Sequence, residues 1–475
     1  MSGSIILMVA YLINIVMVLS LIFIERKDID STWAWLLVML LFPGFGFILY
    51  LLLGQNLSKE KIFNEKKIKD QKMSKELIED YKKEKRIQKL DDSYLDFIRF
   101  NFNNCGALYT SGNEVNIYTE GENKFKDLIM DIREAKNFIH IQYYIFRLDE
   151  LGNLIINELK KKVDEGVEVR MLVDGMGSKS IRKKDIKYIE GLGIKTSIFF
   201  PRKTPFFSIR INYRNHRKIV VIDGKIGYVG GFNVGDEYVN KGKQFDYWRD
   251  THIRIKGNAV NELNKRFILD WDYASEGELK DVKKYFPTQL SNGDIGMQII
   301  SSGPDNKEEY IKNAYMKMIN SARKSVYIQT PYLVPDKSIN EALKMAALSG
   351  IDVRIMVPGD PDHFFMDWIL SANMGELLKS GVKIYRYEIG FIHAKTIVVD
   401  GILSTVGTAN LDIRSFRLNF EINAFIYDEE FSKNMENIFR EDISNCKIMN
   451  IIEYQNRGRL IRIKESLIRL ISPLL

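Results

Sequence analysis

One pattern of residues occurs twice in this chain. It reads His-x-Lys, four residues, Asp, six residues and Gly-x-x-Asn, at residues 216–233 (HRKIVVIDGKIGYVGGFN) and again at residues 393–410 (HAKTIVVDGILSTVGTAN). The whole sequence has only five histidines, so two of them in the same setting indicate an internal repeat. Self-similarity of this kind predicts two copies of one folding unit.

Longer blocks repeat in the same order around the motifs. AKNFIHIQYYIF (135–146) matches ARKSVYIQTPYLV (322–334), GVEVRMLVDG (166–175) matches GIDVRIMVPG (350–359), and GIKTSIF (193–199) matches GVKIYRY (381–387). Each half alternates helices with buried strands, which predicts an α/β fold with helices on both faces of a sheet. We expect two similar domains, residues 111–285 and 294–475, related by a pseudo-twofold axis and joined by a linker at 286–294.

Each motif is expected to form a β-hairpin. Apolar β-branched residues follow the lysine, and the Asp-Gly pair is a tight-turn signal. Because alternate side chains of a strand share a face, His216 would lie beside Lys218, and His393 beside Lys395. Two domains facing each other would bring both pairs to one cleft.

These groups are suited to a phosphodiester. A lysine two residues from each histidine places positive charge where a metal cation would bind, so we expect no metal and no cofactor. Lys218 and Lys395, with the amides of Asn233 and Asn410, can hold non-bridging phosphate oxygens. One histidine can attack phosphorus while the other protonates the departing alkoxide. The sequence leaves open which histidine takes which role.

Four carboxylates accompany the motifs. Asp250 and Glu421 follow them at similar distances and are the candidates to orient the two histidines. Asp223 and Asp400 belong to the repeated pattern and count among the candidate catalytic residues. Their turn positions, however, favour capping of their own hairpins.

The remaining histidines carry less information. His140 and His252 are expected to be satisfied residues of the core or the sheet. His363 lies in a predicted loop and is a candidate to line the cleft. The two cysteines form neither a zinc spacing nor a disulfide framework.

The amino terminus carries two apolar stretches, at residues 5–24 and 33–53. Each is about long enough to cross ~30 Å of hydrocarbon, which predicts a two-helix transmembrane hairpin over residues 1–56. Pro43, Gly44 and Gly46 interrupt the second stretch, so it either spans or is re-entrant. Residues 59–90 hold twelve Lys or Arg against seven Asp or Glu, which places the catalytic domains on the cytoplasmic side of the cell membrane.

Charge also marks the segments outside the repeats. The net charge of +7 favours an anionic partner, and residues 57–110 are predicted to be a charged juxtamembrane linker. Residues 457–475 combine basic side chains with an apolar stripe at helical spacing, formed by Leu460, Ile463, Leu467, Leu470 and Leu474. This pattern predicts an amphipathic helix that either lies in an anionic membrane interface or packs on the second domain.

The two motifs in duplicated α/β halves resemble the phospholipase D superfamily. Similarity to bacterial cardiolipin synthases is closer and covers nearly all of the chain, through segments such as TWAWLLVMLLFPGFGFILYLLLGQN, RINYRNHRKIVVIDG, GGFNVGDEY, WRDTHIRI and VGTANLDIRSFRLNFEINA. The resemblance implies that two phosphatidylglycerol molecules are joined into cardiolipin with release of glycerol, through a phosphatidyl-histidine intermediate. It assigns the nucleophile and acid/base roles to His216 and His393.

One departure from the superfamily concerns the residue after the glycine of each motif. Many members carry serine there, whereas this chain has Gly231 in the first motif and Thr408 in the second. A hydroxyl contact is therefore expected on the second side only.

Two other classes of function share these features. A hydrolytic phospholipase D, or a membrane-bound phosphodiesterase or nuclease, would use the same catalytic core. A non-catalytic module that binds anionic membranes would need no paired histidines, so the intact motifs in both halves argue against it. We expect phosphatidylglycerol and an anionic membrane surface as partners, and no nucleic acid. The sequence leaves open the oligomeric state and whether phosphatidylethanolamine serves as a donor.

Overall fold

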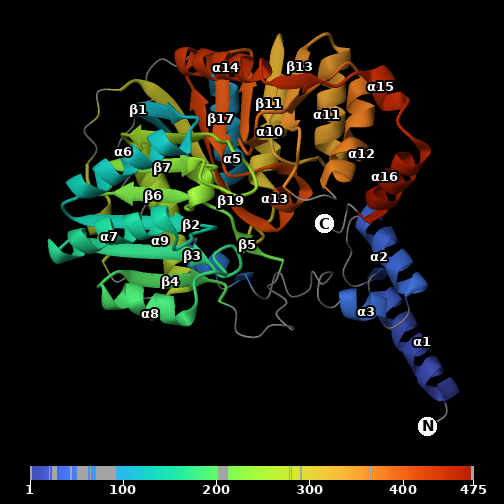
Figure 1. Cartoon of the computed structure of the whole chain (residues 1–475), viewed down its shortest axis with the longest axis horizontal. Coiled ribbons are helices and arrows are strands. Elements are labelled where there is room, and N and C mark those ends of the chain that lie inside the picture. The colour runs from blue at the N-terminus through green and yellow to red at the C-terminus, as the bar shows by residue number, and fades with distance from the viewer. Residues whose placement is uncertain are drawn as a thin grey trace.

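The protein is described by a computed structural model in which two α/β halves stand side by side (Figure 1). The structure describes residues 3–20, 22–23, 29–42, 45–50, 63–64, 66–70, 92–201, 212–277, 279, 281–288, 291, 293–362 and 366–471. His363, which was a candidate to line the cleft, lies outside these ranges.

One continuous sheet runs through both halves. The strands of the first half lie in the order β1 (Tyr109–Tyr118), β9 (His252–Lys256), β7 (Ile226–Gly230), β6 (Ile219–Ile222), β2 (Phe138–Tyr143), β3 (Glu168–Asp174) and β4 (Lys195–Phe199). The second half repeats this order with β10 (Ile295–Ser302), β19 (Asn419–Tyr427), β17 (Leu403–Gly407), β16 (Thr396–Val399), β11 (Ser325–Gln329), β13 (Asp352–Pro358), β14 (Lys383–Tyr387) and the additional β20 (Cys446–Ile448). The halves meet where β1 pairs antiparallel with β10. The duplicated α/β fold predicted from the repeat is confirmed.

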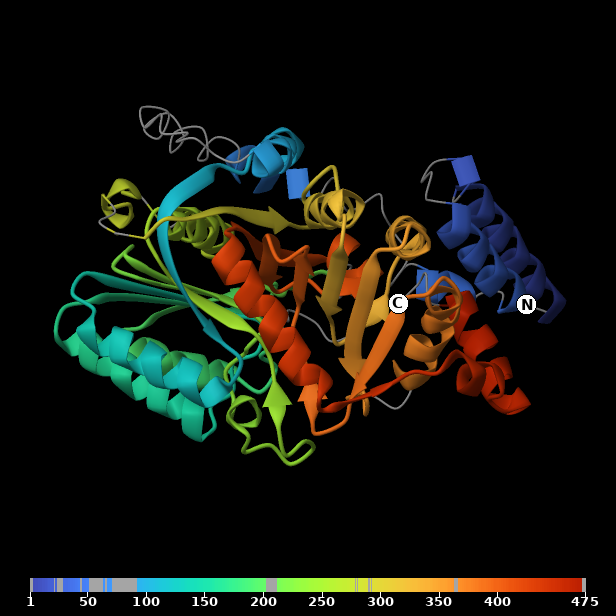
Figure 2. The same ribbon diagram turned by 90° about the horizontal axis from the view of Figure 1, so that it is seen from above.

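Helices cover both faces of this sheet (Figure 2). In the first half α6 (Gly121–Glu134), α7 (Glu150–Asp164) and α8 (Lys183–Gly191) share one core, and α9 (Ala259–Ala274) packs on the other face. In the second half the corresponding helices are α10 (Tyr310–Ser321), α11 (Lys337–Leu348), α12 (Met366–Lys379) and α14 (Glu429–Ile443). Local chemistry repeats too, because Asp149 and Asp336 cap the equivalent helices α7 and α11 through their side chains.

Each motif forms the expected hairpin. Strand β6 pairs with β7, and β16 with β17. Both turns use left-handed backbone at an Asp-Gly pair, with φ of 52° and 65° at Asp223 and Gly224, and 54° and 65° at Asp400 and Gly401. The last paired residues, Ile222 with Ile226 and Val399 with Leu403, enclose three-residue turns. Successive positive φ values at the Asp-Gly pair suit such a tight turn, so the turn is encoded locally.

Part of the segment between the amino terminus and the repeats belongs to the folded body. Helix α5 (Asp92–Cys105) packs on the second half through buried Phe97. Phe63 is buried, with its ring 5.2 Å from that of Tyr213 and 5.5 Å from that of Phe420. The described residues of the predicted linker therefore make tertiary contacts with both halves.

The amino-terminal helices are α1 (Gly3–Ser20), α2 (Ile29–Leu41) and α3 (Phe45–Leu49), and Figure 1 shows them set apart from the sheet. The Asn14 amide donates to the Met39 carbonyl at 3.2 Å, which joins α1 to α2. Within the described ranges, no helix combines the length and the apolar character that crossing a membrane requires. The structure thus does not show the predicted transmembrane hairpin.

Candidate active site

Two short strand pairs hold each motif against the opposite half. Strand β5 (Arg214–Asn215), just before the first motif, pairs with β19 of the second half. Strand β15 (Phe391–Ile392), just before the second motif, pairs with β8 (Trp248–Arg249) of the first half. The His216 amide donates to the Phe420 carbonyl at 2.9 Å, and the His393 amide to the Arg249 carbonyl at 2.7 Å. The two motifs are thus anchored reciprocally.

Because of this pairing, each histidine is oriented by a carboxylate from the other half. Nδ1 of His216 lies 3.0 Å from Oε2 of Glu421, and Nδ1 of His393 lies 2.6 Å from Oδ2 of Asp250. Both carboxylates are fully buried, so each needs the hydrogen bonds that surround it. The sequence indicated these two residues, but not that each would serve the histidine of the other half.

Burial keeps both imidazoles neutral, and the carboxylates fix their tautomer. Burial lowers the pKa of His216, against the opposing effect of Glu421, and lowers the pKa of His393 to about 3. Both rings are therefore neutral near pH 7, with Nδ1–H donating to the carboxylate and the lone pair on Nε2. Burial raises the pKa of Asp250, but Lys395 and His393 outweigh it and keep that pKa low. The arrangement provides two nucleophilic or basic nitrogens.

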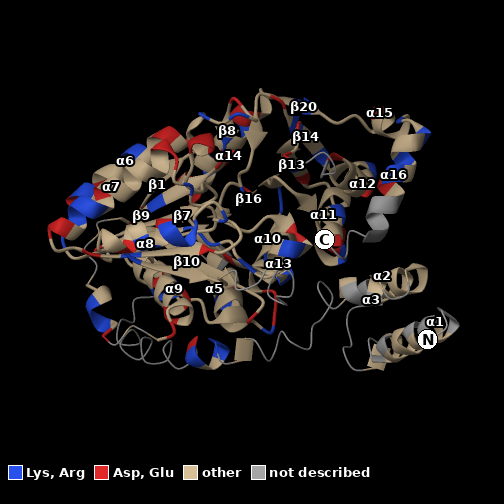
Figure 3. Cartoon of the chain, turned by 60° about the horizontal axis from the view of Figure 1, so that its bottom comes forward, with Lys and Arg blue, Asp and Glu red and all other residues tan. Residues whose placement is uncertain are grey.

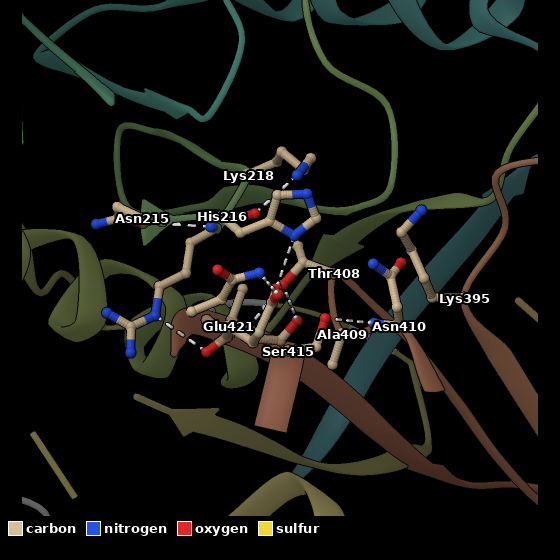
Figure 4. Close-up of polar contacts among 12 residues, drawn as sticks. Asn215, His216, Lys218, Lys395, Thr408, Ala409, Asn410, Ser415 and Glu421 are labelled. Carbon is tan, nitrogen blue, oxygen red and sulfur yellow. Dashed lines mark hydrogen bonds and ion pairs between the residues drawn. The ribbon is translucent and has the colours of Figure 1, made fainter. Parts of the chain in front are cut away.

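The two lysines lie beside their histidines but not on a strand. Residues 216–218 and 393–395 lie just before β6 and β16, outside any strand. The Lys218 ammonium donates to the His216 carbonyl at 2.7 Å, and that of Lys395 donates to the His393 carbonyl. Burial lowers the pKa of Lys218 to about 7 and that of Lys395 to about 8. Figure 4 shows both lysines near the His216–Glu421 pair.

The asparagines of the motifs are held by the protein. The Asn233 side chain accepts from the Ile145 amide at 3.1 Å and donates to the Tyr238 hydroxyl at 3.2 Å. The Asn410 side chain donates to Asp412 at 3.2 Å, whereas its Oδ1 is buried and has no hydrogen-bond partner among the described residues. Substrate contacts by these amides therefore remain a prediction.

The departure at Gly231 has a steric reason. A Cβ at this position would lie 1.9 Å from Oδ1 of Asp250, so a side chain would displace the carboxylate that orients His393. On the second side, the Thr408 hydroxyl accepts from the Ile422 amide at 2.9 Å and donates to the Ile422 carbonyl at 3.2 Å. The Thr408 hydroxyl also helps to keep the pKa of Glu421 low by hydrogen bonding, so the hydroxyl of the second motif is engaged within the protein.

The motif aspartates lie at the turns, bonded to the backbone. Asp223 accepts from the amides of residues 136–138 at 2.7–2.9 Å. Asp400 accepts from the amides of residues 323–325 at 2.7–2.8 Å. Each carboxylate ties its hairpin to the start of a neighbouring strand. The structure does not bring these two residues to the histidines, and they cap the segments before β2 and β11 instead of their own hairpins.

Two buried ionic clusters support the site and were missed by sequence reasoning; the second one combines Arg249 of the first half with residues of the second half. The members are Arg217, Asp270 and Gln142 on one side and Arg249, Asp442 and Gln329 on the other. Arg217 donates to the Glu421 carbonyl at 3.0 Å, and Arg249 to the Asp250 carbonyl at 2.5 Å, so each cluster supports the backbone of an orienting acid. The equivalent glutamines in the repeated IHIQ and VYIQ blocks were the available signal.

The other two described histidines lie in the interior. His140 stacks on Phe267 with ring centres 4.4 Å apart, and its Nδ1 lies 2.8 Å from the Asn264 side-chain oxygen. His252 is buried, and neither ring nitrogen has a partner within the described part of the chain. Nε2 of His140 is also buried without a partner among the described residues, so the expectation of satisfied histidines is wrong for His252 and is met only at Nδ1 of His140. No three His, Cys, Asp or Glu side chains of the described residues gather as metal ligands.

The chain is similar to known proteins in both sequence and fold. Residues 128–271 and 315–443 match the family described as "Cardiolipin synthase, PLD-like domain", and residues 12–55 match "Phospholipase_D-nuclease N-terminal". The chain is 50% identical to a cardiolipin synthase of Clostridium perfringens, over 95% of this chain and 96% of the relative. It is 49% identical to cardiolipin synthase 2 of Staphylococcus epidermidis, over 99% and 98%. A phosphatidylserine synthase of Haemophilus influenzae shares the fold, with a TM-score of 0.58 at 15% identity, over 79% of this chain and 97% of that one.

Proposed function

The chain belongs to the cardiolipin synthase family of phospholipase D-like proteins, and from this premise we propose how its site makes cardiolipin. The enzyme is a phosphatidyltransferase, and the substrates that we propose are two phosphatidylglycerol molecules. One observation carries the proposal: each half supplies a histidine and a lysine, together with the acid that orients the other half's histidine. Such a site is complete only when both halves are present.

The first step breaks the bond between phosphorus and the headgroup glycerol. Nε2 of one histidine attacks phosphorus and forms a phosphatidyl-histidine. The other histidine, in its protonated form, gives its proton to the glycerol oxygen as that oxygen leaves. The charge of the phosphodiester favours this protonation, against the burial that lowers the imidazole pKa. Lys218 and Lys395 stabilise the charge on the non-bridging oxygens.

The second step reverses the first with a new alcohol. A terminal hydroxyl of a second phosphatidylglycerol gives its proton to the now neutral acid/base histidine and attacks phosphorus. The bond between phosphorus and Nε2 breaks, and cardiolipin leaves. One phosphodiester has replaced another, so the reaction requires no nucleotide. Water in place of the second lipid would give phosphatidic acid, which is the hydrolytic alternative.

We also propose that the amino-terminal helices attach the protein to a membrane. Large apolar side chains are exposed along α1 and α2, including Met8, Val16 and Leu40, and exposed apolar surface of this kind is typical of lipid contact. The match of residues 12–55 to an N-terminal family of phospholipase D-like proteins supports this. The two-span topology and the cytoplasmic side of the catalytic halves remain predictions from the sequence.

Purified full-length protein in phosphatidylglycerol vesicles tests the function. Mass spectrometry should find cardiolipin and glycerol in equal amounts, with phosphatidic acid as a minor product. The His393→Ala variant, prepared identically, controls for contaminating activity. Phosphatidic acid as the main product would establish the hydrolytic alternative.

A further inference from the structure

The carboxyl-terminal helix α16 (Arg459–Ile471) packs with a charged side against the protein. It packs on α12 of the second half. Glu465 of α16 is only 3% exposed and accepts from Nε of Arg457 at 2.8–2.9 Å. The Arg457 guanidinium lies 3.7 Å from the ring centre of Tyr454, whose hydroxyl donates to the Ser371 carbonyl of α12 at 2.7 Å.

The apolar side of the same helix faces away from the protein. Leu460 is 75% exposed and Ile463 is 56% exposed. With 3.6 residues per turn, both lie roughly opposite Glu465 around the helix. A helix on a globular surface normally buries its apolar stripe and exposes its charges. Here the charged Glu465 is buried and these two stripe residues are exposed, although the side chains of Leu467, Leu470 and Leu474 lie outside the described part.

We propose that α16 is an interfacial helix that inserts Leu460 and Ile463 into the surface of an anionic bilayer. The charge pattern favours an anionic bilayer as the binding partner, because Arg459 and Arg462 are exposed on the same helix and suit anionic headgroups. A second copy of the chain on this face would bring these like charges together. Figure 3 shows basic residues on α16, and Figures 1 and 3 place α16 on the same side of the molecule as α1 and α2.

This inference rests on the proposed function, because a bilayer is where its lipid substrates lie, and it adds a second attachment point. The amino-terminal helices precede both catalytic halves, whereas α16 is packed on the second half. Contact at α16 would therefore hold that half at the bilayer.

A fluorescent probe on α16 tests the contact in the full-length protein. Cys105→Ala and Cys446→Ala give a background without native thiols, and Leu460→Cys is then labelled with an environment-sensitive dye. Nanodiscs of phosphatidylglycerol or of phosphatidylcholine, each with spin-labelled lipid, provide the quencher. Leu154→Cys on α7, another exposed leucine, is the matched control. We expect quenching at least twofold stronger for the α16 label than for the control in phosphatidylglycerol discs, and weaker quenching in phosphatidylcholine.

Further variants distinguish the electrostatic from the apolar contribution to lipid contact. They also distinguish this inference from the proposed function. The double variant Arg459→Gln and Arg462→Gln should weaken the binding of α16 to the anionic bilayer by about tenfold or more and remove the dependence of that binding on salt. Leu460→Ser with Ile463→Ser should reduce quenching at a label on Ile461→Cys and leave the melting temperature unchanged. An unquenched label in a protein that still makes cardiolipin would overturn this inference and leave the function standing. A dimer in detergent that the double serine variant disperses, with no quenching, would assign the face to a second copy instead.

Discussion

The two halves use the same catalytic scheme with different parts. The first half contributes a short acid, Asp250, and leaves room for it with Gly231. The second contributes a longer acid, Glu421, beside a threonine whose hydroxyl bonds the backbone. Duplication has thus preserved the histidine, the lysine and an acid in each half. Next to the acid, the first side has no space for a Cβ, whereas the second side accommodates a threonine.

The surroundings of the two histidines differ as well. The Tyr144 ring lies 4.9 Å from His216, whereas the Trp248 ring lies 5.3 Å from His393. Among the described residues of the segment before the repeats, buried Lys66 joins the supporting cluster of the first side, 3.0 Å from Asp305 and 3.8 Å from Asp270. The two imidazoles are chemically distinct, so we expect a trapped phosphatidyl adduct on one of them and not on both.

The largest effect should come from removing either histidine. His216→Ala or His393→Ala should each reduce cardiolipin formation by about 10³-fold or more, and the double variant should be hardly worse, because the two act as a unit. Lipid mass spectrometry of membranes checks this, with immunoblotting to equalise the amount of enzyme. A single variant that keeps a tenth of the activity would disprove the two-histidine mechanism.

Replacing either orienting acid with its amide should be nearly as damaging. Each replacement should affect the histidine of the other half. Asp250→Asn and Glu421→Gln should each reduce activity by about 10²- to 10⁴-fold, since a neutral amide no longer fixes the imidazole tautomer. Carbethoxylation of the histidines, located by peptide mapping, shows which ring responds. Asp250→Asn should alter the rate at His393 and leave His216 within about twofold; the reverse would contradict the crossed pairing.

A smaller asymmetry is expected at the residue after the motif glycine. Gly231→Ala should reduce activity by about 10- to 100-fold, because the new methyl group displaces the Asp250 carboxylate and with it His393. Thr408→Ala, the matched change on the second side, removes a hydroxyl that bonds the Ile422 backbone and helps to keep the pKa of Glu421 low, but it introduces no clash with the carboxylate and should cost less. Steady-state kinetics of both variants, with melting temperatures as a control, distinguish the two sides. Equal losses would show that Gly231 has no special role.

The smallest effect is the dependence on pH. Since burial lowers the pKa of Lys218 to about 7 and of Lys395 to about 8, both lose positive charge as pH rises through this range. We therefore expect kcat/KM, which reports the free enzyme, to fall several-fold between about pH 7 and 9. In the complex the phosphodiester raises both lysine pKa values, so kcat should fall only at higher pH. Profiles of kcat/KM that stay flat to pH 9 would argue against cationic lysines at the phosphate.

Local sequence determined much of what was predicted. The alternation of helices and strands, the Asp-Gly hairpins and the two His-Lys pairs depend on residues close together in the chain, so periodicity and turn chemistry reveal them. The identities of Asp250 and Glu421 were also within reach, because they follow equivalent motifs at similar distances. The conformation of the two lysines could not be predicted in this way, since each buried ammonium donates to a carbonyl of its own motif.

Tertiary structure decided which parts work together. The bonds from His216 to Glu421 and from His393 to Asp250 join residues 205 and 143 positions apart, and neither residue's neighbours in sequence encode the choice of partner. The need for Gly231 appears only once the Asp250 carboxylate lies against it. The sequence likewise specified an amphipathic helix at the carboxyl terminus but not which side faces the protein. Packing against α12 settled that, because the Arg457–Glu465 pair and Tyr454 fix the charged side inward and leave Leu460 and Ile463 exposed.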